Sequence, residues 1–288
     1  RSSSCPVRPI STANSKNAQG EYLFAGYSVN TQPFIRGSSG AVSYVGDSGT
    51  SSVPLDSGTS VQTGDPGSSV FMNVPTGNGT FTVAAGSANT GTGAADAGSV
   101  TNAAAWAADQ YTITFTDATD YTVTDSAGDP VANGTYDPGN GGNIDFKGIE
   151  VGISGAPAAG DTFTVSPSGA GSIFDTLDSL AGALNNAGSS AAARAQLTSA
   201  LAQSLQQVDQ AMTQVSTVTT NVGSRISLIS SVNTSVSAQS TAVTTQISNL
   251  YSLDYAAATS QYSQEYLALQ AAEQSYAQLG QLSLFKYL

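Results

Sequence analysis

The sequence predicts an elongated α+β fold, in which a β-rich head domain is inserted before a long, helical, coiled-coil-like stalk. Three observations lead to this prediction. In residues 37–171, short runs alternate apolar and polar residues, which is typical of strands with one buried face. From residue 172 the apolar residues are spaced by three and four, which is typical of amphipathic helices. The helical spacing continues, more thinly, to the end of the chain.

The first 36 residues follow neither pattern. Residues 1–9 have no periodicity, and we expect them to be disordered and foreign to the rest of the chain. Residues 10–36 are interpreted as a connector that contains the end of a helix and a short strand. The connector is compatible with a helix up to Gln19. The apolar run Tyr22–Gly26 then predicts a buried strand or a tight corner, which we favour over a ligand site.

The head, residues 37–171, is predicted to be an antiparallel sheet packed into a small sandwich or barrel. Its candidate strands alternate apolar and polar residues, and clusters of Gly, Asp, Asn or Pro bound each of them. The stretch of residues 86–99 is low in complexity and is expected to be a mobile loop. The candidate strands are Phe81–Val83, Tyr111–Phe115, Tyr121–Val123, Ile144–Phe146, Ile149–Ile153 and Thr162–Val165.

The stalk, residues 172–250, begins with a short amphipathic helix that is expected to end near Asn186. A much longer helix is predicted for residues 191–250, and unbroken it would extend roughly 90 Å. Its apolar positions form a stripe that needs a partner helix to cover it. The stripe consists of Leu197, Leu201, Leu205, Val208, Met212, Val215, Val222, Ile226, Ile229, Val236, Val243, Ile247 and Leu250.

Residues 251–288 are interpreted as a C-terminal polymerisation helix. Only Asp254, Glu265, Glu273 and Lys286 are charged there, and a solitary helix in water would carry more charge. We therefore expect this segment to be marginal alone and to order among neighbouring helices. The predicted assembly interface is the apolar set Leu250, Ala258, Tyr262, Tyr266, Leu269, Tyr276, Leu279, Leu282, Leu284 and Phe285.

Composition argues against catalysis. Histidine, the commonest general base, is absent, and only 10% of the residues are charged. We expect no enzyme activity, no cofactor and no metal. Residues 37–170 hold thirteen acidic residues and one basic residue, whereas the remainder of the chain is neutral. This distribution indicates a solvated head and a packed stalk, and it makes nucleic acid an unlikely partner because no basic patch is present.

The chain also lacks the features of a disulfide-rich or membrane-inserted protein. It has a single cysteine, Cys5, and no apolar run of eighteen residues. Its N-terminal residues do not resemble a cleavable signal peptide. Because the surface is poor in charge and rich in hydroxyl groups, we expect an extracellular protein that is exported without such a signal and is not inserted in a membrane.

Carboxylates at two places in the head could be read as metal ligands. Asp161 follows Gly160, which is more typical of a turn than of a metal ligand. The aspartates at positions 117, 120, 125 and 129 lack the spacing and the terminal Glu of a calcium loop. Both groups are therefore interpreted as turn residues on a solvated surface.

Four motifs in a fixed order carry a resemblance to a known family. The first runs from Gly20 to Phe34 and includes Tyr22, Leu23, Phe24, Gly26 and Pro33. The second comprises Tyr111–Phe115 and then Gly148–Phe163, with Gly160, Asp161 and Phe163. The third is Asn221–Ile226, with Gly223 and Arg225. The fourth is Leu267–Ala272 followed by Leu282–Leu288. Together they resemble the flagellar hook-associated protein 3 family.

This resemblance implies a structural subunit that joins the hook to the filament of a bacterial flagellum. The implied partners are copies of the chain itself, hook-associated protein 1, flagellin and a flagellar export chaperone. Members of the family begin with a long N-terminal helical region that nothing here matches, so the chain is expected to lack it. The alternatives are a flagellin-type filament subunit, a trimeric adhesin or phage-fibre stalk with a β head, and a polysaccharide-acting enzyme.

Overall fold

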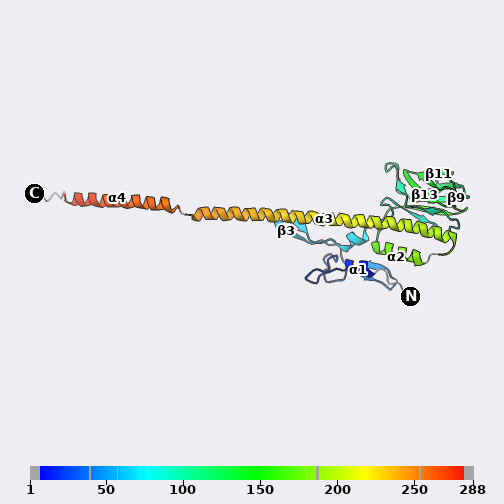
Figure 1. The fold of residues 1–288 in the computed structure, drawn as a ribbon, viewed down its shortest axis with the longest axis horizontal. Helices are drawn as coiled ribbons and strands as arrows, with labels where there is room; N and C mark the ends of the chain where they lie inside the picture. The colour runs from blue at the N-terminus through cyan, green and yellow to red at the C-terminus, as the bar shows by residue number, and fades with distance from the viewer. Residues whose placement is uncertain (1–6, 39, 57, 186–187, 253, 282–288) are drawn as a thin grey trace. The chain divides into compact units, whose positions relative to one another are not determined.

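The computed structural model describes residues 7–38, 40–56, 58–185, 188–252 and 254–281. The chain divides into two units, Arg1–Ser227 and Leu228–Leu288. The first unit holds the connector, a β-rich head and the first part of a long helix. The second holds the remainder of that helix and a further helix. The mixed α+β class predicted from the sequence is confirmed (Figure 1).

The connector begins with a helix, which corrects one expectation. Helix α1 spans Val7–Ala13, so residues 7–9 are helical, not disordered. Pro9 lies in the first turn, where a missing N–H does not break a helical hydrogen bond. The helix ends at Ala13, well before Gln19, and the Asn14 side chain that follows hydrogen-bonds the backbone N–H and C=O of Phe34.

The prediction of a strand at Tyr22–Gly26 is wrong, and the alternative prediction of a tight corner is confirmed. Only an isolated bridge joins Tyr22 to Lys16, and the following residues form turns. Gly26 has φ +70°, and a Cβ atom there would lie 2.3 Å from the backbone oxygen of Asp47. A strand cannot accommodate this backbone, because left-handed φ reverses the chain direction. The short strand of the connector is instead β1, Phe34–Arg36.

Two small hairpins and an aromatic cluster complete the part of the first unit outside the head. Strand β1 pairs with β2 (Val42–Tyr44), and β3 (Ser52–Asp56) pairs with β4 (Thr59–Gln62). A π-helix, η1, spans Ser68–Met72. Phe34, fully buried, contacts the rings of Tyr44, Phe71 and Phe174 at centroid distances of 5.1–5.5 Å. This cluster joins α1, the first hairpin, η1 and helix α2 (Ile173–Asn185).

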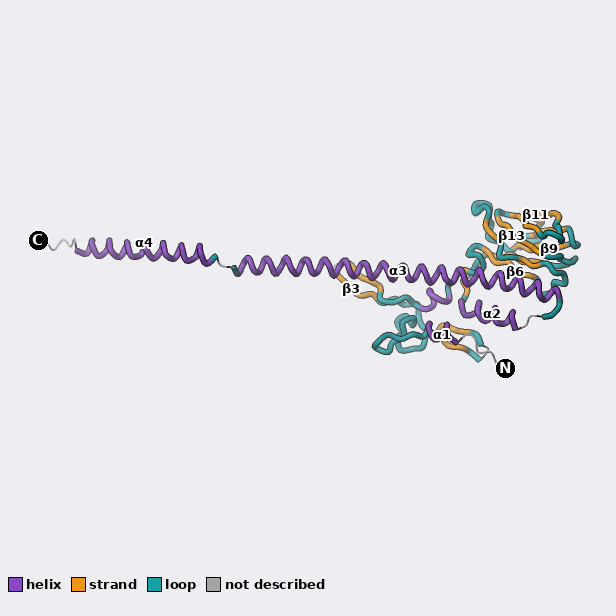
Figure 2. The backbone as a smooth tube through the Cα atoms, viewed as in Figure 1, coloured by secondary structure: helices purple, strands orange, loops and turns teal. Residues whose placement is uncertain are grey.

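The head is a β-sandwich with two antiparallel sheets, visible as the strand-rich part of Figure 2. One sheet has the order β11-β10-β9-β14-β6, and the other has the order β12-β13-β7, with β8 also paired to β13. The strands are β6 (Phe81–Ala85), β7 (Ala94–Ala95), β8 (Ser99–Val100), β9 (Tyr111–Phe115), β10 (Asp120–Thr124), β11 (Pro130–Thr135), β12 (Gly142–Phe146), β13 (Ile149–Ser154) and β14 (Thr162–Pro167).

All six candidate strands of the sequence analysis are present in this sandwich, and their alternation has the expected cause. In β9 and β13 every second side chain is buried, and the buried faces of the two sheets meet in one core. The core includes Phe81, Ile113, Phe115, Val151 and Phe163, all fully buried or nearly so.

The prediction of a mobile loop at residues 86–99 is also wrong. This stretch contains β7, the start of β8 and the buried Asn89. The Asn89 side chain donates to the Thr162 C=O and accepts from its N–H. Low sequence complexity here reflects small residues that fit against neighbouring backbone, since a Cβ at Gly91 would lie 2.4 Å from the Ala158 nitrogen.

The helices follow the spacing read from the sequence. Helix α2 spans Ile173–Asn185, α3 spans Ala191–Tyr251 and α4 spans Tyr255–Gln281. The Ser172 and Ser190 hydroxyls accept from backbone N–H groups at the starts of α2 and α3, and Asp254 does so for α4. Many Ser and Thr hydroxyls along α3 and α4 donate to the carbonyl four residues earlier, which satisfies these weak helix formers within the helix.

Candidate assembly surface

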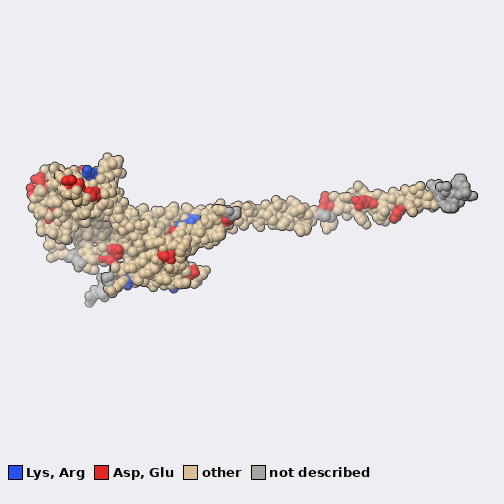
Figure 3. All heavy atoms as spheres, turned by 180° about the vertical axis from the view of Figure 1, so that it is seen from behind, with Lys and Arg blue, Asp and Glu red and all other residues tan. Residues whose placement is uncertain are grey.

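An apolar stripe on α3 and α4 faces solvent in the described chain. Large apolar side chains remain exposed along α3, among them Ile226, Val236 and Val243, and Leu250 is 84% exposed. The space-filling view in Figure 3 shows almost no charge over this stretch of α3. Because contiguous exposed apolar surface is rare on monomers, the stripe is a candidate contact surface.

Five of the ten predicted interface residues are exposed on α4. Tyr262, Tyr266, Leu269, Tyr276 and Leu279 are between 52% and 79% exposed. Ala258 is half-buried. Leu282, Leu284 and Phe285 lie outside the described residues. No contact of these side chains tests the assignment, and it stays a prediction.

The aromatic members of this surface are arranged along the helix. Tyr262 and Tyr266, one turn apart, stack with ring centroids 6.4 Å apart and an interplanar angle of 17°. Glu265 accepts a hydrogen bond from the Gln261 side chain. The helix therefore presents wide apolar rings with a few weakly polar neighbours, which suits close packing against another helix.

The first family motif forms a corner that connects several segments. The Leu23 N–H donates to Ser15, the Tyr22 N–H donates to Val29, and the Phe24 C=O accepts from the Gly67 N–H. Tyr22 also lies 4.4 Å from the Lys16 ammonium, in cation–π geometry. Gly20 turns the chain with φ +86°, and Pro33 is buried. Leu23 is 48% exposed, which differs from a buried strand residue.

Asp47 holds this corner from outside the motif. Its carboxylate accepts hydrogen bonds from the Tyr27 N–H, the Ser28 hydroxyl and the Gly49 N–H. The Tyr27 N–H, more than the other donors, holds the pKa of Asp47 below its ordinary value of 3.8. The sequence analysis did not single out this residue, although Asp before Ser-Gly is a common turn signal.

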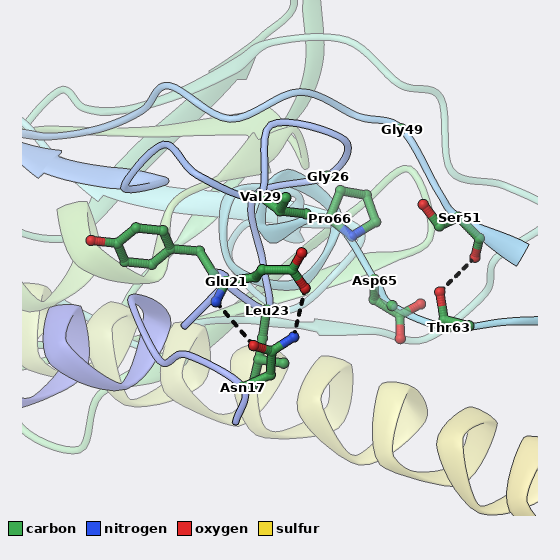
Figure 4. Close-up of a pocket in the computed structure, with 12 residues that line it drawn as sticks. Asn17, Glu21, Leu23, Gly26, Val29, Gly49, Ser51, Thr63, Asp65 and Pro66 are labelled. Carbon is green, nitrogen blue, oxygen red and sulfur yellow. Dashed lines mark hydrogen bonds between the residues drawn. The ribbon is translucent and has the colours of Figure 1, made fainter. Parts of the chain in front are cut away.

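A cavity of about 380 Å³ lies beside the corner (Figure 4). In Figure 4 Asn17 hydrogen-bonds Glu21, and the Thr63 hydroxyl donates to the Ser51 C=O. Asp65 also lines the cavity, but its carboxylate binds Arg225 of α3. Both carboxylates are thus held by neighbouring side chains, which gives the cavity a structural part in the corner.

The third motif places Arg225 on the same side of α3 as the second hairpin. The Arg225 guanidinium donates to both oxygens of Asp65, at 2.7 and 2.9 Å, and to the Gln62 amide at 3.3 Å. The hydrogen bonds to Asp65 raise the pKa of Arg225. Nothing lies within 4 Å of a Cβ built on Gly223, so packing gives no reason for glycine there.

The second motif belongs to the head, and Asp161 is its central residue. The Asp161 carboxylate is 2% exposed and accepts from the N–H groups of Thr90, Gly91 and Ala158. Gly160 precedes it with φ +87°, and Phe163 is in the core. This carboxylate therefore ties residues 86–99 to the sandwich. The aspartates at positions 117 and 125 accept from N–H groups two to four residues ahead, as turn residues do.

Sequence reasoning missed a polar row on α3 that contacts the head. The Ala95 N–H donates to the Ser199 hydroxyl at 2.9 Å. The Gln203 amide donates to Asp96 C=O, and the Gln207 amide bonds Gly77 and Pro75. Gln196 and Gln214 donate to carbonyls of residues 87, 89 and 69. Glutamines spaced by four and seven, with Ala195 and Ala211 buried beside them, were the available signal.

The described residues contain no cluster of three or more His, Cys, Asp or Glu side chains that could hold a metal ion. Within the same residues no helix has both the length and the hydropathy needed to cross a lipid bilayer.

Comparison with known proteins identifies the family. Residues 205–288 match the bacterial flagellin C-terminal helical region, and residues 84–167 match the D2-like domain of flagellar hook-associated protein 1. No curated protein sequence matches the chain.

Solved structures match most of the chain. FlgL from Xanthomonas campestris is 34% identical with a TM-score of 0.76, and the match covers 83% of this chain and 77% of that one. Flagellar hook-associated protein 3 from Legionella pneumophila is 30% identical with a TM-score of 0.79, covering 86% and 78%. The flagellar junction protein FlgL from Legionella pneumophila is 33% identical with a TM-score of 0.71, covering 77% and 75%. The chain belongs to the FlgL family of flagellar hook-associated protein 3, whose members are structural proteins of the bacterial flagellum.

Proposed function

We propose that this chain is the subunit that joins hook to filament, and that it assembles by burying the apolar stripe of α3 and α4 among helices of neighbouring subunits. The observation that carries the proposal is the combination of exposed apolar side chains with a nearly uncharged helix surface. Water solvates such a surface poorly, and helices packed around it would cover it at about 25 cal/mol per Å².

The partners follow from this role. Copies of the chain would form the junction, hook-associated protein 1 would lie on one side and flagellin on the other. An export chaperone would cover the stripe before assembly. The site of action would be outside the cell, at the junction. Membership of the FlgL family supports these partners, and the flagellin-like match of residues 205–288 supports helix packing with flagellin. A purely structural role is also part of the proposal, and no catalytic step is assigned.

The test introduces a single carboxylate into the proposed interface. Leu269→Glu should abolish junction formation, because burying an unpaired charge among helices costs several kcal/mol. Gln274→Glu, on the opposite side of α4, is the matched control. The measurements are swimming motility and the amounts of subunit in flagella and in the medium. The expected result is loss of motility with the variant exported and its head folded.

Normal motility of the Leu269→Glu strain would refute the assignment of α4 as the interface. The two structural alternatives predict other outcomes of the same preparation. A flagellin-type subunit would be abundant along isolated filaments, and a trimeric fibre stalk would give one discrete trimer on crosslinking.

A further inference from the structure

The head is joined to the rest of the first unit through a narrow neck of two paired strands. Strand β5 (Val74–Pro75) leads into the head and β15 (Ala170–Gly171) leads out, with Pro75 opposite Ala170. Beyond this pair, Thr76 and Gly169 exchange hydrogen bonds, and the Ser168 hydroxyl donates to the Thr76 C=O at 2.8 Å. Both passages of the chain into the head therefore lie side by side at Thr76.

One side chain of α3 hydrogen-bonds backbone groups of this neck. The Gln207 Oε1 accepts from the Gly77 N–H at 2.9 Å, and its Nε2 donates to the Pro75 C=O at 3.0 Å. Gln207 is 8% exposed. A Cβ built on Gly171 would lie 3.7 Å from Nε2 and 2.8 Å from the Thr76 methyl group, so this side chain also lies against the second neck strand.

Forming both hydrogen bonds at once requires a primary amide. Glutamine offers one donor and one acceptor side by side, and they match a C=O and an N–H on either side of Thr76. A carboxylate could serve only the N–H, and an ammonium could serve only the C=O. Rotation of the head about its neck would displace Pro75 and Gly77 relative to α3 and break both bonds.

The contact between head and α3 includes further hydrogen bonds beside the buried Ala195 and Ala211. None of the described residues in the core of the sandwich comes from α3. Ser199 and Gln203 hydrogen-bond backbone groups of residues 95 and 96. Directional hydrogen bonds from Ser199, Gln203 and Gln207 to the backbone therefore help to fix how the head sits on this part of the helix.

We propose that Gln207 is a positioning residue that locks the orientation of the head on the first part of α3, Ala191–Ser227, by clamping the neck. Without its amide the head stays folded around its own core but turns about the neck. The lock contains no charge, so its strength does not depend on salt or on pH near neutrality.

The first experiment measures orientation directly. Spin labels at Ser126→Cys in the head and Thr217→Cys on α3, in a Cys5→Ser background, report the distance between them by pulsed electron resonance. Gln207→Ala should broaden the distance distribution about twofold and speed hydrogen exchange at the Gly77 amide about tenfold. Gln206→Ala makes the same change one position away, where the described residues provide no side-chain hydrogen bond. A distribution for Gln207→Ala equal to that of Gln206→Ala would overturn the proposal.

A second variant separates positioning from folding. Gln207→Glu should release the head at pH 7, because the carboxylate then faces the Pro75 C=O without a proton to donate. Below a pH of about 4.3 the protonated acid can donate to Pro75 and accept from Gly77, and the narrow distribution should return. The neck segments Val74–Gly77 and Ser168–Gly171 carry no titratable side chain, and the next acid along α3, Asp209, is exposed. Gln206→Glu and the unmodified chain should not respond in this way. Failure of Gln207→Glu to recover at low pH would also contradict the clamp.

Discussion

The head and helix α4 both carry large aromatic and aliphatic side chains, but the head buries them and α4 exposes them. In the head, Ile113, Phe115 and Phe163 are fully buried between two sheets. In α4, the large side chains of Tyr262, Leu269 and Tyr276 are exposed to solvent. The head thus completes its own core within one chain, whereas the apolar side chains of α4 stay exposed in the described chain.

This difference teaches where the stability of each region comes from. The head is stabilised by side chains that alternate along its strands and meet across the sandwich. The Ala-, Ser- and Gln-rich α4 has helix propensity and internal hydroxyl bonds, but little tertiary packing within the described chain. Mutations should therefore lower the free energy of unfolding in the head and change association in α4.

The largest expected effect is a loss of stability of the head. Phe163→Ala should lower the free energy of unfolding of the head by about 3–5 kcal/mol, because it removes a ring from the centre of the core. Leu269→Ala, exposed in the monomer, should change unfolding by less than about 0.5 kcal/mol. Denaturant unfolding followed by circular dichroism measures both. Equal losses for the two variants would show that α4 is packed within the monomer.

A smaller effect is expected at Arg225, where a residue of α3 is packed within the chain, in contrast to the exposed residues of α4. Arg225→Ala should destabilise the hairpin β3–β4 and η1 by about 1–2 kcal/mol, since it removes a two-pronged ion pair whose side chains are 21% and 19% exposed. High salt should reduce the difference. Arg194→Ala, which removes only a hydrogen bond to the Ser189 C=O, is the control. Hydrogen exchange of the hairpin amides gives the magnitude, and unchanged exchange in Arg225→Ala would exclude the ion pair as a support.

The smallest effect concerns pH and the corner held by Asp47. Because the pKa of Asp47 is lower in the folded chain than its ordinary 3.8, its contribution to stability is present above that value and is lost as the pH falls through the folded pKa. The amide of Tyr27 should therefore lose its protection only in acid below pH 3.8. Asp47→Asn should abolish this acid transition, as a titration of the Tyr27 amide signal by NMR would show. The α4 amides should not follow the transition.

The spacing of apolar residues allowed the helices and strands to be predicted from the sequence. Alternation in Tyr111–Phe115 and Ile149–Ile153 predicted strands because these residues have one face in the core. The stripe from Leu197 to Leu250 predicted a long helix because its spacing persists across the glycine at position 223. The resemblance to the hook-associated protein 3 family, carried by four ordered motifs, is confirmed by the solved FlgL structures.

Interactions between segments far apart in the chain could not be predicted from the sequence. The apolar run Tyr22–Gly26 resembles a strand locally, but hydrogen bonds to residues 15, 29 and 67 fold it into a corner. Residues 86–99 look featureless, yet Asp161, some seventy positions later, orders them. The polar row on α3 was hidden for the same reason, because its partners are backbone groups that any sequence carries. The interface residues of α4 stay a prediction.

The pairing of Pro75 with Ala170 has a consequence for how such chains can diversify. Because the two ends of the segment are held together, lengthening it raises the entropic cost of closing the chain only slowly, by about 0.6 kcal/mol for each doubling of its length. The stretch between them can therefore be shortened, enlarged or exchanged for another folded module without moving the helices on either side. Grafting a foreign domain at these two positions is the natural engineering use of this scaffold.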